Sequence, residues 1–125
     1  MDKLTLAHEW YRFAAMDLSS AKYLLNMKPS PVEIICYHCQ QSAEKFLKGF
    51  LVLHDINPPK IHDLDELCKL CIEIEIEFQD IIDQCSDLTA YGIQPRYPAE
   101  INLEEQDLQQ ALKSAETIRD FILPT

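Results

Sequence analysis

The sequence contains little glycine, few basic residues and no long apolar run. Gly49 and Gly92 are the two glycines among 125 residues, too few for the tight turns of an all-β fold or for a glycine-rich phosphate-binding loop. No apolar run approaches the roughly 18 to 20 residues of a membrane span, and the N-terminus lacks the pattern of a signal peptide. We therefore expect a cytoplasmic protein that is neither a membrane protein nor a dinucleotide-binding or P-loop enzyme.

Basic residues are outnumbered, with 11 Lys and Arg against 21 Asp and Glu and a formal net charge of -10. Residues 1–62 carry seven basic and six acidic residues, net +1, whereas residues 63–125 carry four basic and fifteen acidic residues, net -11. The chain as a whole therefore repels nucleic acid, and any contact with RNA or phosphate must be local. For the second half, the simpler interpretation is an acidic surface that keeps the protein soluble.

Length and periodicity predict one all-α domain over residues 1–125. A hydrophobic content of 47% is enough for one core and not for two. Apolar residues recur at three- and four-residue steps in four segments, which predicts an up-down four-helix bundle with room for a short fifth helix. The predicted helices span residues 4–27, 31–56, 63–88 and 102–123.

Helix boundaries follow from capping residues and prolines. Ser30 and Glu33 have the spacing of a capping box before the second helix, and Asp63 and Glu66 repeat it before the third. Residues 72–78 alternate between apolar and acidic and resemble a half-buried strand. We interpret them as part of one helix of about 25 residues, because no second strand-like run exists to pair with them. Asn102 is expected to open the last helix.

Apolar residues on two predicted helices indicate how the core is covered and whether the chain assembles into oligomers. In the first helix, Phe13 and Leu24 are expected to widen the stripe that faces the core. In the third, Ile72 and Ile76 fall outside the main stripe, so apolar surface remains after one core has been faced. This excess predicts a homodimer.

The five cysteines include two pairs with metal-site spacing. Cys36 and Cys39 form one CxxC pair, and Cys68 and Cys71 form another; the spacing resembles that of a four-thiolate zinc site. Both pairs lie within predicted helices among core residues, where cysteine acts as a small apolar filler. We therefore predict reduced thiols, no metal and no cofactor.

The second helix carries an unusual polar ridge, consisting of His38, Gln41, Lys45 and Lys48. These residues follow one another at helical steps on an otherwise apolar helix. A partly cationic ridge suggests a binding groove in which the lysines supply charge for a phosphate. The alternative is a solvated face or a polar patch at a dimer interface.

The loop of residues 89–101 contains a second candidate. Arg96 lies between two prolines and is flanked by Tyr91 and Tyr97. The prolines restrict the loop, so the guanidinium can bind a phosphate or carboxylate with a smaller loss of entropy. The tyrosines offer stacking surfaces for a base. Alternatively, Arg96 pairs with a nearby acidic residue of the chain.

Four segments occur in a characteristic order: Trp10–Leu25 (WYRFAAMDLSSAKYLL), Cys36–Lys48 (CYHCQQSAEKFLK), His62–Leu64 (HDL) and Arg96–Pro98 (RYP). Together they resemble the HEPN domain, the higher-eukaryote and prokaryote nucleotide-binding family. The resemblance implies a helical bundle of four or five helices that dimerises, a nucleotide ligand and a minimal nucleotidyltransferase partner, as in toxin–antitoxin-like pairs.

The family's ribonucleases use an arginine followed four to six residues later by a histidine. Arg96 has no histidine at that spacing, and none occurs after His62, so no catalytic residue is assigned. Our leading hypothesis is a non-catalytic module that binds a nucleotidyltransferase and a nucleotide through the polar ridge and the Arg96 loop. The alternatives are a metal-independent ribonuclease toxin with an atypical site and a purely structural dimerisation bundle.

Overall fold

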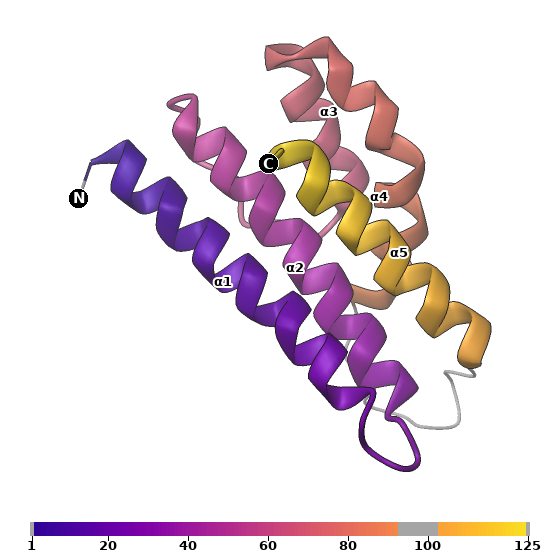
Figure 1. The fold of residues 1–125 in the computed structure, drawn as a ribbon. Helices are drawn as coiled ribbons and strands as arrows, with labels where there is room; N and C mark the ends of the chain where they lie inside the picture. The colour runs from indigo at the N-terminus through magenta and orange to yellow at the C-terminus, as the bar shows by residue number, and fades with distance from the viewer. Residues whose placement is uncertain (1, 93–102, 125) are drawn as a thin grey trace.

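A computed structural model describes residues 2–92 and 103–124, which form helices and contain no strand (Figure 1). The all-α prediction is confirmed, as is the decision against a strand at residues 72–78. The elements are α1 (Lys3–Leu24), α2 (Val32–Leu53), α3 (Leu64–Ile74), the 3-10 helix η1 (Ile76–Ile81), α4 (Ile82–Thr89), the 3-10 turn η2 (Ala90–Gly92) and α5 (Glu105–Ile122).

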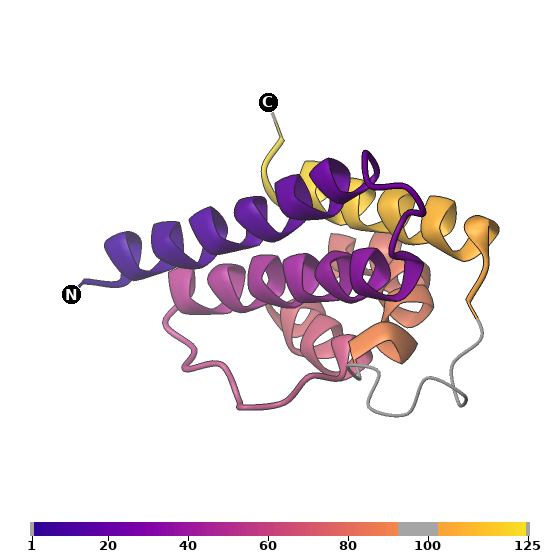
Figure 2. The same cartoon turned by 90° about the horizontal axis from the view of Figure 1, so that it is seen from below.

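The central element is α2, which packs against α1 on one side and against α3 and α5 on the others (Figures 1 and 2). It is the most apolar helix, as its sequence predicts, and most of its residues are buried. Helix α1 runs along the outside of α2 and touches α5 only at a few positions. Among the described helices, none combines the length and apolar character that a membrane span requires.

Small residues let α1 and α2 approach closely. Ala7, Ala14 and Ala21 are fully buried at seven-residue spacing on α1. The Ser42 hydroxyl of α2 donates a 2.7 Å hydrogen bond to the Ala14 carbonyl. A Cβ atom at Gly49 would lie 2.6 Å from the Tyr11 ring, so α1 fits against α2 at this point only because Gly49 has no side chain.

The prediction of one long third helix is wrong. Helix α3 ends at Ile74, and Glu75 adopts an extended backbone (φ -141°, ψ 110°) before η1 begins. Phe78 and Ile81 of η1 are buried in the core. Within the same alternating segment, Ile76 is exposed.

The predicted caps are partly confirmed. The Asp63 carboxylate accepts hydrogen bonds from the first backbone N–H groups of α3. The box at Ser30 is wrong: α2 starts after Pro31 without a side-chain cap. The Ser30 hydroxyl instead donates hydrogen bonds to the Leu25 and Met27 carbonyls. These bonds close the turn that follows α1.

Two further corrections concern α5 and α1. Helix α5 starts at Glu105, later than predicted, with a capping box between Glu104 and Asp107; Asn102 lies outside the described residues. Phe13 is exposed instead of widening the core stripe, because α1 contacts its neighbours along one face. The buried face of α5 consists of Leu108, Ala111, Leu112, Ser114, Ala115 and Ile118.

Candidate functional site

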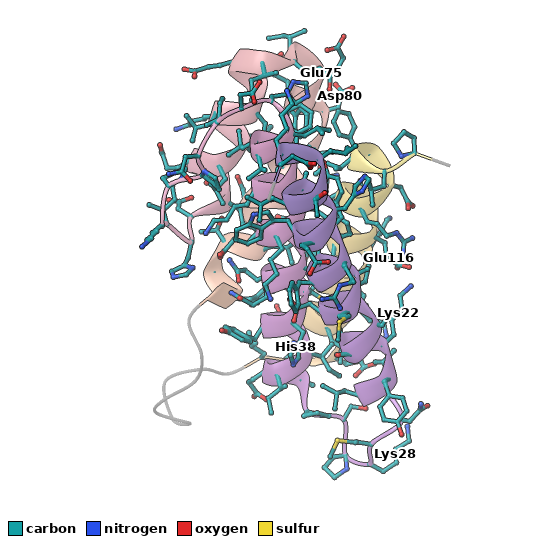
Figure 3. The ribbon with its side chains drawn as sticks, turned by 90° about the vertical axis from the view of Figure 1, so that its left-hand side faces the viewer. Lys22, Lys28, His38, Glu75, Asp80 and Glu116 are labelled. Carbon is teal, nitrogen blue, oxygen red and sulfur yellow. The ribbon has the colours of Figure 1, made fainter. Side chains whose placement is uncertain are left out.

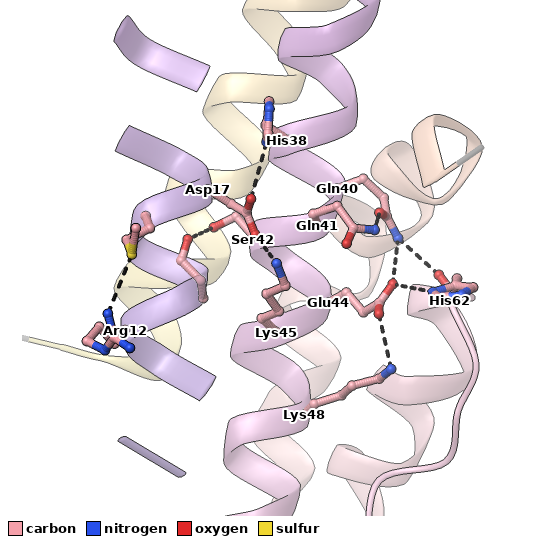
Figure 4. Close-up of polar contacts among 12 residues, drawn as sticks. Arg12, Asp17, His38, Gln40, Gln41, Ser42, Glu44, Lys45, Lys48 and His62 are labelled. Atoms are coloured by element: carbon pink, nitrogen blue, oxygen red, sulfur yellow. Dashed lines mark hydrogen bonds and ion pairs between the residues drawn. The ribbon is translucent and has the colours of Figure 1, made fainter. Parts of the chain in front are cut away.

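The polar ridge of α2 divides into two separate clusters (Figure 4). On the side of α1, His38 and Lys45 meet Asp17; these three residues are the Asp17 cluster. On the side of α3, Lys48 joins Glu44, Gln40 and His62, which are the Glu44 cluster. The structure therefore does not present His38, Lys45 and Lys48 as one cationic surface.

In the Asp17 cluster, one carboxylate holds two side chains of α2. His38 Nδ1 lies 3.2 Å from Asp17 Oδ1, and Lys45 Nζ donates to Asp17 Oδ2. Because the carboxylate accepts from Nδ1, the opposite ring nitrogen Nε2 is left to bind a ligand or exchange a proton. Asp17 thus fixes the orientation of the imidazole and balances the charge of Lys45.

His38 also lines a surface cavity of about 500 Å³, within the usual size range of small-molecule sites. The remaining walls come from the last turns of α1, namely Ser19, Ser20, Tyr23 and Leu24. The cavity therefore combines an oriented imidazole, two hydroxyl groups and an exposed aromatic ring. Such a set can bind a phosphate and stack a base.

In the Glu44 cluster, a buried carboxylate has three hydrogen-bond donors. Lys48 Nζ lies 3.1 Å from Glu44 Oε2, while His62 Nδ1 and Gln40 Nε2 lie 3.0 and 3.2 Å from Oε1. The side chains of Glu44 and Lys48 are only 6% and 8% exposed. The Lys48 ammonium is therefore turned toward its own chain rather than toward solvent.

Gln41 is bonded to the Glu44 cluster, whereas the Tyr91 hydroxyl is bonded to α5, outside both clusters. Gln41 donates a 2.8 Å hydrogen bond to the Gln40 side chain. The Tyr91 hydroxyl donates to Asp107 at 3.2 Å, and burial together with that carboxylate raises the pKa of Tyr91 to about 12. Gly92 lies against the Gln40 side chain, so the chain leaves η2 beside the Glu44 cluster. Arg96 and Tyr97 lie outside the described residues.

The cysteines behave as core residues. All five are fully buried, and burial raises the pKa of Cys36 and Cys39 to about 12. Both thiols are therefore protonated at neutral pH, whereas a metal ligand or nucleophile must be a thiolate. Within residues 2–92 and 103–124, no three His, Cys, Asp or Glu side chains are placed to hold a metal ion together.

Comparison with known proteins decides the family. The sequence model of the HEPN domain matches residues 7–124. The chain belongs to the HEPN domain family. Similar folds occur in TT1696 from Thermus thermophilus and in ST0689, an archaeal HEPN homologue. TT1696 has a TM-score of 0.76 and 23% identity, with 93% of this chain and 94% of that chain covered. ST0689 has a TM-score of 0.70 and 23% identity, with 93% of this chain and 93% of that chain covered.

No curated protein matches the sequence of this HEPN domain. At 23% identity the solved structures establish the fold, which agrees with the family expected from the sequence segments. Asp17 and Glu44, the carboxylates at the centres of the two clusters, are not among the site residues predicted from the sequence. Glu44 had a recognisable signal, because it is a charged residue among apolar neighbours in the middle of the most buried helix. Asp17 had none, since its partners are more than twenty residues away.

Proposed function

We propose that this HEPN domain is a non-catalytic module that binds a minimal nucleotidyltransferase and, at the His38 cavity, a nucleotide. One observation carries the proposal: the lysines of the polar ridge are paired within the chain, Lys45 with Asp17 and Lys48 with Glu44. Phosphodiester cleavage needs a cation on the phosphate beside a proton-transfer group. Because both ridge lysines are paired with carboxylates, the ridge has no free lysine for that step, and we infer binding rather than cleavage.

The nucleotide proposal rests on what surrounds the cavity. Ser19 and Ser20 line the same cavity as His38 and offer hydroxyl groups to a phosphate, and Tyr23 offers a face for the base. Lys45 stands behind Asp17 and offsets part of its repulsion toward an anion. In this proposal, Arg96 and Tyr97 add a forked phosphate contact and a second stacking ring.

The partner proposal rests on the acidic surface formed by α3, η1 and α4. Its exposed carboxylates suit a nucleotidyltransferase with a basic surface, because opposite potentials steer association. Glu75 and Asp80 lie at one end of the molecule, far from Lys28 at the other (Figure 3). The exposed acidic residues are Glu73, Glu75, Glu77, Asp80, Asp83 and Asp87.

Calorimetry with the nucleotidyltransferase that co-purifies from the native cell tests the partner. We expect a stoichiometric complex that weakens about tenfold or more when Glu75 and Asp80 are both changed to lysine. Asp120→Lys makes the same kind of charge change at an exposed site on α5 and should have little effect. A native extract that yields no nucleotidyltransferase with the purified chain would contradict the proposal.

Thermal unfolding with AMP or ATP tests the nucleotide. A ligand at 100 times its dissociation constant adds about 2.7 kcal/mol to the free energy of unfolding. His38→Ala should abolish the shift and Asp17→Asn should reduce it, whereas Lys69→Ala, at an exposed site of α3, should leave it unchanged. If no nucleotide at millimolar concentration raises the melting temperature, the nucleotide part fails and the partner part is unaffected.

The carboxylate behind His38 favours one second candidate, a metal-independent ribonuclease. An imidazole held by Asp17 has the orientation that proton transfer requires. The test is incubation of RNA with the pure protein in EDTA, beside the His38→Ala and Arg96→Ala variants. If the wild-type protein cleaves RNA and both substitutions abolish the cleavage, the ribonuclease function replaces the non-catalytic one. If the RNA stays intact, the non-catalytic proposal is supported.

A further inference from the structure

A second surface cavity, which we call the α4–α5 cavity, has a volume of about 240 Å³. The two helices pack side by side (Figure 1), and the cavity shares no residue with the His38 cavity. It is smaller than the roughly 300 to 1,000 Å³ of sites for drug-sized ligands, and far larger than the volume of one water molecule. All its lining residues are polar or charged: Gln84 and Asp87 of α4, and Gln110, Lys113, Ser114 and Thr117 of α5.

The Gln84 side chain has a hydrogen-bond acceptor without a donor. Its Oε1 atom is buried and accepts no hydrogen bond from the described part of the chain. A buried polar atom without a partner costs folding free energy, so such an atom in the wall of a cavity indicates a ligand with a hydrogen-bond donor. The terminal torsion of a glutamine side chain turns readily, which allows the oxygen to meet a donor that enters the cavity.

The α4–α5 cavity also has one charge of each sign. Asp87 comes from α4 and Lys113 from α5, and within residues 2–92 and 103–124 neither has an ion-pair partner within 4.0 Å. Ser114, only 5% exposed, adds a hydroxyl group. The Thr117 hydroxyl donates to the Lys113 carbonyl at 2.9 Å, so its lone pairs are left to accept. A ligand that complements this set has a donating cation and an accepting anion close together.

These features exclude three other classes of ligand. A nucleotide needs a larger cavity, and none of the six lining residues has an aromatic ring to stack its base. Inorganic phosphate would be repelled by the Asp87 carboxylate. A divalent cation would find one carboxylate beside the Lys113 ammonium, whereas such ions take several oxygen ligands.

We propose that the α4–α5 cavity binds a free α-amino acid with a small or polar side chain. The α-ammonium group donates hydrogen bonds to the Asp87 carboxylate and to Gln84 Oε1, and the α-carboxylate accepts from Lys113 and Ser114. The Gln110 amide is left for a polar side chain of the ligand. Because the two cavities share no residue, this site and the proposed nucleotide site can each exist without the other.

Titration of the isotope-labelled full chain with L-serine and with L-glutamine, followed by NMR, tests the site. We expect resonances of α4 and α5 to move, with a Kd of about 1 mM or lower for at least one of the two. Betaine, the N-trimethyl form of glycine, is the matched ligand control. It has the same two charges but no N–H donor, so it should bind about tenfold more weakly or less.

Three substitutions test the assigned contacts. Asp87→Asn and Lys113→Met should each raise the Kd about tenfold or more, whereas Asp120→Asn, at an exposed site on α5, should leave it unchanged. Gln84→Met should weaken binding to a similar extent. It should also raise the melting temperature of the ligand-free chain, because the variant has no unpaired buried oxygen. Circular dichroism checks that each variant keeps the wild-type helix content.

Four results would overturn the proposal. The first is that no resonance of α4 or α5 moves with either amino acid at about 10 mM. The second is that betaine binds as tightly as the amino acid. The third is that Gln84→Met binds as the wild type does. The fourth is that AMP displaces the amino acid, because the ligand would then occupy the His38 cavity.

Discussion

Glu44 and Lys48 show how a charged pair is kept inside an apolar bundle. Both side chains are almost fully buried, and the carboxylate has hydrogen-bond donors on each oxygen. Burying two charges costs solvation free energy that their attraction only partly returns. The pair is therefore sensitive to the loss of one member, because the other is left charged or unsatisfied in the core.

We predict that Glu44→Gln lowers the free energy of unfolding by about 3 kcal/mol, since it leaves the Lys48 ammonium without a carboxylate. Urea denaturation of the variant and the wild type measures the change. Glu66→Gln is the matched control, because Glu66 pairs with Lys69 at an exposed site, where such pairs contribute about 0 to 1 kcal/mol.

The double variant Glu44→Leu with Lys48→Met shows which effect destabilises Glu44→Gln. The two possible effects are the lost attraction between the charges and the buried Lys48 charge left without a partner. The double variant removes both charges and fills similar volume, so it should be clearly more stable than Glu44→Gln. If the double variant is the less stable of the two, the attraction within the pair is what stabilises the core, and our explanation is wrong.

At the scale of elements, the close contact between α1 and α2 depends on small residues, alanine on α1 and glycine on α2. No local feature of the sequence explains why a glycine, Gly49, stands within the second helix. The reason is tertiary: the Tyr11 ring and the Trp10 Cβ of α1 occupy the space that a side chain would need.

Gly49→Ala should destabilise the protein by about 1 kcal/mol, as measured by thermal or urea unfolding. Alanine improves helix propensity by about 0.8 to 1 kcal/mol, but a Cβ 2.6 Å from the Tyr11 ring forces repacking that costs about 1 to 3 kcal/mol. Combining the change with Tyr11→Leu, which clears the ring, should make Gly49→Ala neutral or stabilising. An equal penalty in both backgrounds would exclude this contact as the cause.

The segment of residues 72–78 shows why element boundaries were harder to predict than elements. The alternation of apolar and acidic residues is typical of a strand, and the helical periodicity on both sides predicted an unbroken helix. The segment forms neither: α3 ends at Ile74 and a 3-10 helix follows. The break at Glu75 has no proline or glycine to signal it. It is favoured because Phe78 then packs between Phe50 and Phe121, with ring centroids 4.4 and 4.9 Å apart. Those partners belong to α2 and α5, so a local pattern contains no information about them.

For the whole molecule, protonation of buried groups sets the alkaline limit of stability. Burial raises the pKa of Cys36 and Cys39 from 9.0 to about 12, and that of Tyr11 from 10.0 to about 12. The folded state keeps protons that the unfolded chain loses. The stabilisation is therefore fully present below about pH 9 and is lost as the pH rises toward 12.

We accordingly expect the urea midpoint to be constant between about pH 7 and 8.5 and to fall steadily above pH 9. Tyr11→Phe should flatten the part of the fall above about pH 10, because it removes one of the groups that titrates there. A midpoint that stays constant up to about pH 11 would show that these groups ionise without cost in the folded state.

Charge distribution makes a second prediction for the whole molecule. With a net charge of -10, and -11 in residues 63–125 alone, the folded chain is destabilised by repulsion that salt screens. Added sodium chloride should raise the melting temperature by several degrees. The dependence should be smaller for a Glu73→Lys and Glu77→Lys double variant, since both residues lie on the acidic surface. An equal salt effect in that variant would point to general salting-out instead.

By itself, the sequence determined the helical class, the family and most of the core, because apolar periodicity, capping residues and ordered motifs are local properties of the chain. The tertiary structure decided which polar residues meet. Asp17 reaches His38 and Lys45, and Glu44 reaches His62, only when helices distant in sequence pack side by side. It also decided that Phe13 faces outward, since the burial of an apolar residue depends on what its neighbours leave uncovered.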